Sequence, residues 1–172
     1  ERSGAALEGI ADPAKRQAAA DTRLRAIGRL DEQRAVLDVA SRKHSNVGAL
    51  VQARVTAFRA ATPGLPAPIV TLDAPDIAEP RVLGVIGAAV SIGLCNIARH
   101  AKDVSRISVD LTESDQRISL SIQNDGGITE WDALEGRGLT HLRSEVRRLG
   151  GPKPKWGPAP DGGWALNLSL AA

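Results

Sequence analysis

Three short clusters of polar residues and glycines carry the residue types that could bind a ligand. They are Asn96-x-x-Arg99-His100-Ala101, Asn124-Asp125-Gly126-Gly127 and Gly136-Arg137-Gly138-Leu139. Two glycines before a helix expose backbone N–H groups to an anion, and the positive end of the helix dipole strengthens that attraction. Taken alone, a Gly-x-Gly is more often an ordinary loop before a helix than a phosphate site. The assignment of a phosphate site to the third cluster therefore depends on the first two clusters as well.

The first cluster lies near the C-terminal end of a predicted helix. Proline suits the first turn of a helix, so Pro80 marks its start. Apolar or small residues then recur at spacings of three and four, at Val82, Val85, Ile86, Ala89, Gly93 and Ile97. Asn96 and His100 are four residues apart and are predicted to project from the edge of this stripe. The apolar run is shorter than the roughly 18 residues that span a bilayer, which favours a core helix.

The second and third clusters adjoin strands and a helix. Alternating apolar residues predict strands over 106–111 and 117–123, joined by a polar turn at 112–116. Asn124-Asp125-Gly126 follows the second strand, in a loop whose residue types tolerate positive φ. The third cluster precedes a predicted helix, Leu139 to Leu149, which Gly150 and Gly151 end. Strand ends and helix starts are common places for binding sites.

The other segments are predicted to form the helices and strands that position these clusters. Helices are predicted over 1–30, 33–42 and 47–60, the last with Ser45 or Asn46 as its N-cap. A proline-rich break at 62–68 leads to a strand at 69–72 and an acidic turn. Strands over 153–156 and 164–170 end the sheet. The helix at 1–30 either packs on this domain or belongs to a helical dimer stem, and the sequence favours neither strongly.

Composition limits the class of protein. The 172 residues suit one domain with a modest addition. Aromatic residues make up only 2%, which predicts an aliphatic core and argues against single-stranded nucleic-acid binding. With 22 basic and 20 acidic residues, charge alone implies no nucleic-acid or membrane partner. The single Cys95 excludes a disulfide framework and fits a reducing compartment. The absence of an initial Met predicts a piece of a longer protein.

The order of the three clusters resembles the ATP-binding domain of sensor histidine kinases, most closely the NarL/DesK-type branch of the GHKL superfamily, which also contains gyrase. The match covers roughly residues 46 to 170. Asn96, Arg99 and His100 match the N box, Asn124-Asp125-Gly126 the G1 box, and Gly136-Arg137-Gly138-Leu139 the G2 box. The resemblance implies a two-layer α/β sandwich of the GHKL (Bergerat) type with an N-terminal helical extension. Residues 1–45 are then a stem or linker, and 46–172 the ATP-binding domain.

The resemblance also implies a function and a set of site residues. The domain would present Mg-ATP to a histidine on a dimer stem, from which the phosphoryl group passes to a response regulator. It would be a cytoplasmic domain, within a sensor protein that is in many cases membrane-bound, and a homodimer through its stem, with no nucleic-acid partner. Asn96 would hold Mg²⁺. The implied ATP-binding residues are Asn96, Arg99, His100, Asn124, Gly126, Gly136, Gly138 and Leu139.

Three departures from the family pattern affect the chemistry. Ile92 stands where the family has a Glu, Asn124 where an acidic residue accepts a hydrogen bond from the adenine amino group, and Trp164 where a Thr follows Gly-x-Gly. These changes leave open an alternative, a degenerate pseudokinase domain that acts through protein contacts with weak or no ATP binding. A GHKL anti-sigma-like regulator that phosphorylates a partner's serine is a further alternative.

Three further residues, His44, Trp131 and His141, have side chains of a kind found in such sites. His44-Ser45-Asn46-Val47-Gly48 is similar to the family's phosphoacceptor sequence, but too few residues separate His44 from Asn96 to hold a two-helix stem, so we predict that the acceptor lies outside this chain. Trp131 is predicted to lie in a short ATP lid, as a lid anchor or as a cap on the core edge. His141 is predicted to be a solvated surface residue, and no spacing typical of a zinc site occurs.

Overall fold

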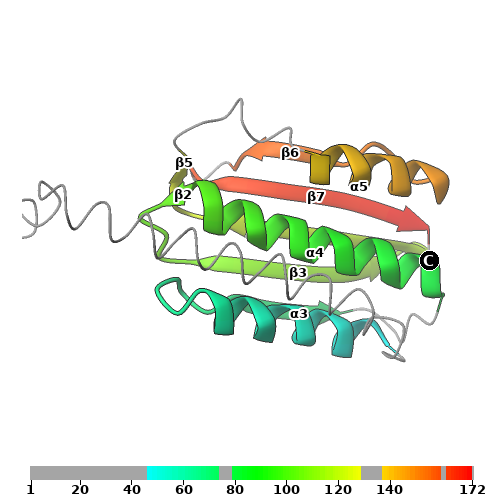
Figure 1. Ribbon diagram of the computed structural model, residues 1–172. Helices are drawn as coiled ribbons and strands as arrows, with labels where there is room; N and C mark the ends of the chain where they lie inside the picture. Colours follow the sequence, from blue (N-terminus) through cyan, green and yellow to red (C-terminus); the bar gives the residue numbers. More distant parts are fainter. Residues whose placement is uncertain (1–45, 74–78, 129–136, 160–161, 172) are drawn as a thin grey trace, which may run out of the picture.

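A five-stranded sheet carries the helices on one of its faces (Figure 1). The computed structural model describes residues 46–73, 79–128, 137–159 and 162–171. The strand order is β1-β3-β4-β7-β6, with β1 parallel to β3 and the other neighbours antiparallel. The predicted two-layer α/β sandwich with a mixed sheet is therefore confirmed.

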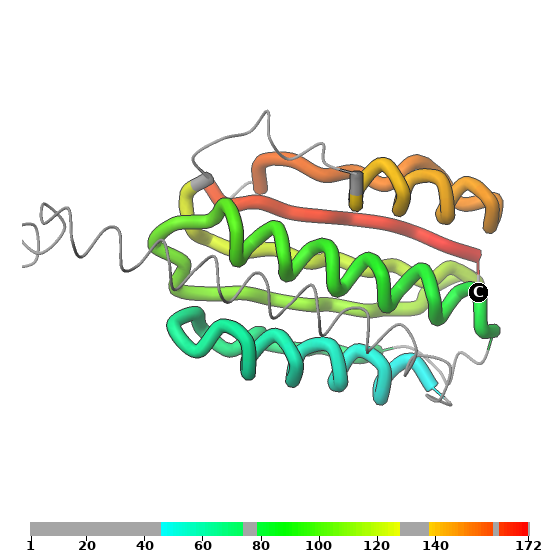
Figure 2. Tube along the Cα trace, in the orientation of Figure 1, coloured from blue at the N-terminus to red at the C-terminus, as the bar shows by residue number. Residues whose placement is uncertain are grey.

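The elements follow the predicted order closely. The helices of this layer are α3 (Val47–Ala61), α4 (Pro80–His100) and α5 (Arg137–Arg148). The sheet is built from β1 (Ile69–Asp73), β3 (Ile107–Ser114), β4 (Arg117–Asn124), β6 (Lys155–Pro158) and β7 (Trp164–Ala171). A separate two-stranded ladder consists of β2 (Ala101–Lys102) and β5 (Gly127–Ile128). The tube view shows α4 between α3 and α5, across the middle of the sheet (Figure 2).

Side-chain caps explain where two of the helices begin. The Oδ1 atom of Asn46 accepts a hydrogen bond from the N–H of Ala49 at 2.8 Å, so Asn46 is the N-cap of α3. The Oε2 atom of Glu79 accepts from the N–H of Val82 at 2.8 Å, and Pro80 follows in the first turn of α4. Each cap satisfies a backbone donor that the helix itself leaves unpaired.

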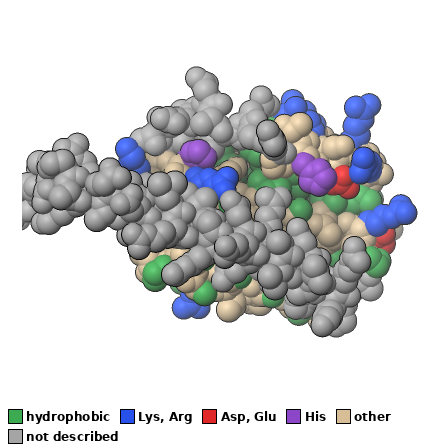
Figure 3. Space-filling model, viewed as in Figure 1, with side chains coloured by type: hydrophobic (Ala, Val, Ile, Leu, Met, Phe, Trp, Pro, Cys, Tyr) green, Lys and Arg blue, Asp and Glu red, His purple; other side chains and the backbone are tan. Residues whose placement is uncertain are grey.

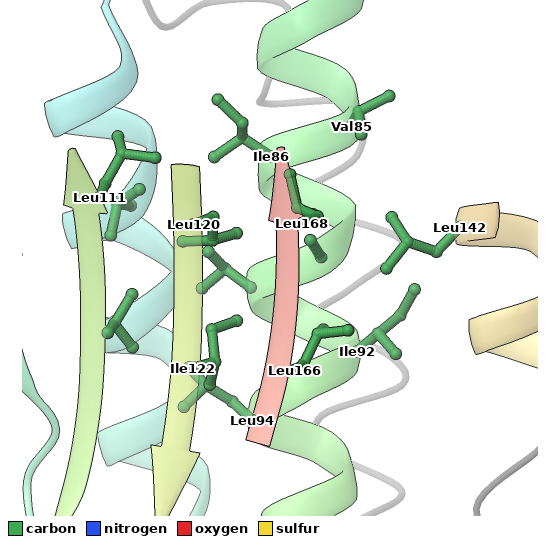
Figure 4. Close-up of a cluster of buried hydrophobic side chains, with 14 of the residues drawn as sticks. Val85, Ile86, Ile92, Leu94, Leu111, Leu120, Ile122, Leu142, Leu166 and Leu168 are labelled. Carbon is green, nitrogen blue, oxygen red and sulfur yellow. The ribbon is translucent and has the colours of Figure 1, made fainter. Parts of the chain in front are cut away.

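The middle helix is the core helix of the domain. α4 is long and apolar enough to cross a membrane by length and composition alone, but 72% of its most apolar window is buried inside the protein. Its buried side chains pack against those of α3, α5 and the sheet, as Figure 4 shows for part of the core. This arrangement is typical of a buried helix in a globular domain and agrees with the prediction.

The β3–β4 hairpin differs from its predicted form. The pairing runs from Ile107–Asn124 to Ser114–Arg117, so both strands continue into the region predicted as a turn. Only Asp115 and Gln116 form the turn, with φ of 51° and 60°. The prediction of a turn over 112–116 was wrong because Thr112 and Ser114 lie on the solvent face of β3, and Glu113 lies at the end of its core face, opposite Ile118. Two-residue hairpin turns with two positive φ values also match the twist of the strands.

The alternation of side chains places the core on one face of the sheet. Ile118, Leu120 and Ile122 on β4 are almost fully buried, whereas the intervening residues are partly or fully exposed. The core is mainly aliphatic, as the composition predicts, with Phe58 and Trp164 as its fully buried aromatic residues among those described. Apolar residues from the helices cover this face, and the other face is mostly polar.

Several predictions lie outside the described residues. They are the helices at 1–30 and 33–42, the acidic turn after β1, His44, Trp131 and Gly136. The predicted end of the last helix is confirmed, because Gly150 has a φ of 71° and the N–H of Gly151 donates to the carbonyl of Val146 at 3.0 Å. His141 is exposed, in agreement with its prediction as a surface residue.

Candidate nucleotide site

The end of α4 and the loop after β4 are held together by the two-stranded ladder. Ala101 directly follows the last residue of α4 and pairs with Ile128, and Lys102 pairs with Gly127. A Cβ on Gly126 would stand 2.4 Å from the carbonyl oxygen of Lys102, so only glycine fits this close approach. The first two predicted clusters therefore meet at one end of the sheet (Figure 1).

The start of α5 reaches the same region. A Cβ on Gly138 would lie 3.4 Å from Cγ1 of Ile92, one turn before Asn96 on α4. Leu139 is only 1% exposed and belongs to the core, so its side chain contributes to packing. The described part of the third cluster thus lies beside the first.

The polar residues at the end of α4 differ in exposure. Asn96 and His100 are half-buried and Arg99 is exposed, as expected for residues at the edge of the buried stripe. The Nδ2 atom of Asn96 is buried and has no hydrogen-bond partner in the described part of the chain. Because this amide is not fixed through its nitrogen, it can turn its oxygen toward a cation, and carbonyl-type oxygens are suitable ligands for Mg²⁺. This end of the site fits the metal that the resemblance implies.

Ile92 is a core residue. Its exposed fraction is 3%, and Figure 4 shows it near Leu142 of α5 and Leu166 of β7. A hydrocarbon side chain here neither accepts a proton nor orients a water molecule. At the position where the resemblance implies a carboxylate, an apolar side chain thus packs between α4 and α5.

Asn124 uses both ends of its amide within the protein. Its Nδ2 atom donates to the carbonyl of Gly126 at 3.0 Å, and its Oδ1 atom accepts from the N–H of Trp164 at 3.3 Å. The residue is 4% exposed. These bonds tie the end of β4 to its own loop and to the start of β7. The adenine contact that the resemblance implies for Asn124 would have to use the second lone pair of Oδ1, on a side chain that is only 4% exposed.

Asp125 has a structural role in this loop that the sequence did not reveal. Its carboxylate accepts from the hydroxyl and N–H of Ser105 and from the N–H of Arg106. The hydrogen bond from the Ser105 hydroxyl is the main cause that lowers the pKa of Asp125 below its ordinary value of 3.8, with the backbone N–H bonds adding to it. Asp125 thus fixes the loop before β3 against the loop after β4. No local motif pointed to this pair.

Trp164 fills the space beside Asn124. It is fully buried, and its indole Nε1 has no hydrogen-bond partner among the described residues. A Cβ on the preceding Gly163 would stand only 1.6 Å from the carbonyl oxygen of Asn124. The backbone at the start of β7 therefore packs directly against the end of β4. The buried indole lies at the end of the site where the resemblance places the adenine base (the base end), so this end does not fit an adenine.

The remaining surface offers no comparable site in the residues that the structure describes. No group of three or more His, Cys, Asp or Glu side chains within them could hold a metal ion. A cavity of about 370 Å³ lies at the C-terminal end of α3, lined in part by Thr56, Arg59 and Leu65, and no residue of the three clusters lines it. Basic side chains predominate along the α5 side of the face in Figure 3, where Arg147 and Arg148 are exposed.

Comparison with known proteins supports the fold. No family model matches the sequence, and no curated protein matches it. The histidine kinase domain of the blue-light-activated kinase EL346 from Erythrobacter litoralis superposes with a TM-score of 0.60 and 22% identity, covering 73% of this chain and 61% of that one. The ATP-binding domain of PrrB from Mycobacterium tuberculosis gives a TM-score of 0.58 and 18% identity, covering 74% and 94%.

A third structure extends the comparison. The histidine kinase AdeS from Acinetobacter baumannii matches with a TM-score of 0.58 and 15% identity over 96% of this chain and 90% of that one. The chain spans about half to three fifths of the EL346 chains that it matches, 51% of one and 61% of the other. At these identities the likeness concerns the fold. The described chain has the fold of histidine kinase ATP-binding domains.

Proposed function

We propose that this chain is a signalling domain of the sensor-histidine-kinase type that does not transfer a phosphoryl group. The observation that carries the proposal is the burial of Ile92 between α4 and α5, at 3% exposure. The resemblance implies a carboxylate at this position. Phosphoryl transfer depends on positioned charges and hydrogen-bonding groups, and isoleucine supplies neither.

The domain acts through protein contacts in this proposal. Its partners are the response regulator and the helical stem of a homodimer, within the cytoplasmic part of a sensor protein. The order of the motifs favours the NarL/DesK-type branch for that protein. A partner protein that binds the surface of the domain depends on the fold and not on a carboxylate at position 92. This explains why an intact core accompanies an altered site.

The test measures ATP hydrolysis and phosphoryl transfer directly. The 172-residue chain is incubated with Mg-ATP labelled on the γ-phosphate, and phosphate release and labelling of the protein are followed over time. Asn96→Ala serves as the control, because it removes the implied metal ligand. We expect the two proteins to release phosphate at the same rate and to remain unlabelled. Faster release by the wild type, or labelled wild-type protein, would overturn the proposal.

A second candidate is the catalytic domain itself, which presents Mg-ATP for phosphorylation of a stem histidine. The buried Nδ2 of Asn96, which lacks a partner in the described residues, favours it, because the amide is available to a metal. Arg99, His100, Gly136, Gly138 and Leu139 would then surround the phosphates, with Asn124 and Gly126 at the base. Phosphate release that depends on Asn96 is the result that would select this candidate.

A further inference from the structure

We infer that Trp164 and Asn124 close the base end of the site, so that this chain does not bind adenine nucleotides. The inference deepens the proposed function and rests on it, because the position of the base end comes from the same resemblance. The structural argument concerns the register of two strands, the hydrogen bonds of one amide and the burial of one indole. Each is independent of Ile92.

Strand register places the two side chains together. β4 and β7 are antiparallel, and Ile122 pairs with Leu166 while Gln123 pairs with Ala165. The next residues outward are Asn124 and Trp164, which face each other on the side of the sheet that bears Ile122 and Leu166. That side faces the helices, and Gly93 of α4 lies against Ile122. Asn96, one turn further along α4, therefore lies toward the same end as this pair.

The amide of Asn124 is buried and makes one hydrogen bond within the protein at each of its ends. Its nitrogen and oxygen are both bonded to backbone groups, of Gly126 and Trp164. A base could use only the remaining N–H or oxygen lone pair of a side chain that is 4% exposed. Turning the amide toward a base would leave two buried backbone groups unpaired, which opposes binding. The carboxylate that the resemblance implies could not donate to Gly126, so the internal bonding depends on the change to Asn.

The indole of Trp164 occupies volume that a smaller residue would leave open. The ring is fully buried even though its N–H finds no partner among the described residues, so apolar packing holds it in place. Displacing a buried Trp ring from a core weakens a competing ligand by more than about a hundredfold. The start of β7 lies directly against the end of β4, because a Cβ on Gly163 would stand only 1.6 Å from the carbonyl oxygen of Asn124.

Nuclear magnetic resonance of the wild-type chain gives the first test. The ¹⁵N-labelled protein is titrated with Mg-ATP to millimolar concentration, and the indole signal of Trp164 is assigned with a Trp164→Phe variant. Mg-tripolyphosphate is titrated separately as a probe of the phosphate end. We expect no saturable shift with ATP beyond that seen with tripolyphosphate. Saturable, submillimolar ATP binding that tripolyphosphate does not reproduce would overturn the inference.

A pair of variants tests which ring is responsible. Trp164→Thr opens the space beside Asn124, and Trp156→Thr removes a half-buried indole on β6 that stacks with Arg143 4.7 Å away. We expect ATP affinity to rise by at least about tenfold in Trp164→Thr only. A folded Trp164→Thr protein that gains no affinity would overturn the assignment to this ring. Should this variant not fold, the wild-type titration decides.

Different experimental results would overturn the proposed function and the closure of the base end. Wild-type ATP binding with phosphate release no faster than that of Asn96→Ala would overturn the closure of the base end and leave the proposed function standing. Phosphate release above that of Asn96→Ala would overturn both. Absence of both binding and release supports both.

Discussion

At the scale of single residues, two adjacent side chains at the end of β4 form hydrogen bonds within the protein. Asn124 bonds to Trp164, 40 positions away, and Asp125 bonds to Ser105, 20 positions away. A sequence pattern shows that a polar loop follows the strand, but it does not show which backbone groups the loop satisfies. The internal hydrogen bonds of Asn124 could not be predicted from the sequence, because they depend on how the strands pair.

Asp125→Asn should lower the stability of the fold at neutral pH. The folded pKa of Asp125 lies below the ordinary value of 3.8, so its stabilising contribution is present above that pH and is lost as pH falls through the folded-state value. Because the carboxylate is exposed and screened, we expect a loss of about 1 kcal/mol. Urea unfolding at pH 7 should separate the two proteins, and unfolding at pH 3 should bring them closer.

The Ser105→Ala variant provides the control for this prediction. Ser105 donates both its hydroxyl and its N–H to Asp125, and alanine removes only the hydroxyl bond. The double variant should lose less stability than the sum of the two single variants, since the two side chains share one interaction. Additive losses would show that Asp125 does not stabilise the loop through Ser105.

At the scale of elements, periodicity predicted most of the fold. The apolar stripes located α3, α4 and α5, and alternation located the strands, because burial on one face imposes those periods. The length of the β3–β4 turn was missed, since polar residues occur both in turns and on the solvent face of a strand. The short β2–β5 ladder was also missed, because two-residue strands have no period to detect.

Gln116→Gly should stabilise the hairpin. Gln116 has a φ of 60°, a left-handed conformation that glycine adopts without a steric penalty. We expect a gain of about 0.5–1 kcal/mol in the free energy of unfolding, because relief of this strain exceeds the added entropy of the unfolded chain. Chemical denaturation measures the change.

Ser119→Gly is the matched control for the turn. Ser119 is exposed in the middle of β4, where φ is that of a strand and glycine brings no relief. A loss of about 0.5–1 kcal/mol is expected there. If both glycine variants destabilise the protein equally, the turn is not strained at Gln116.

At the scale of the whole molecule, the resemblance carried by the three clusters predicted that they lie together, and the described residues bring the first two of them together. The fold brings the end of α4 and the loop after β4 to one end of the sheet, and the start of α5 lies beside Ile92, one turn before Asn96 on α4. The closure of the base end could not be predicted, because it depends on the register of β4 against β7. The burial of Ile92 likewise follows from how α4 and α5 pack, and Figure 4 shows that junction.

Ile92→Glu should destabilise the whole domain instead of restoring chemistry. The residue is 3% exposed and lies against Gly138, so an ionised carboxylate there would be buried without a partner. We expect a loss of about 3 kcal/mol or more at pH 7. Burial raises the pKa of such a Glu, so the loss should shrink as pH falls toward 5 and the carboxylate becomes protonated. Thermal unfolding across this pH range measures the effect.

Two further substitutions at the same position separate charge from shape. Ile92→Val keeps the side chain apolar and should cost only about 0.5–1.5 kcal/mol, with no change between pH 5 and pH 7. Ile92→Gln has the size of Glu without its charge and should be destabilised equally at both pH values. A Glu variant as stable as the Val variant at pH 7, with ATP-dependent phosphate release, would mean that position 92 opens into the site. That result would move the assignment from a pseudokinase to a catalytic domain lacking one group.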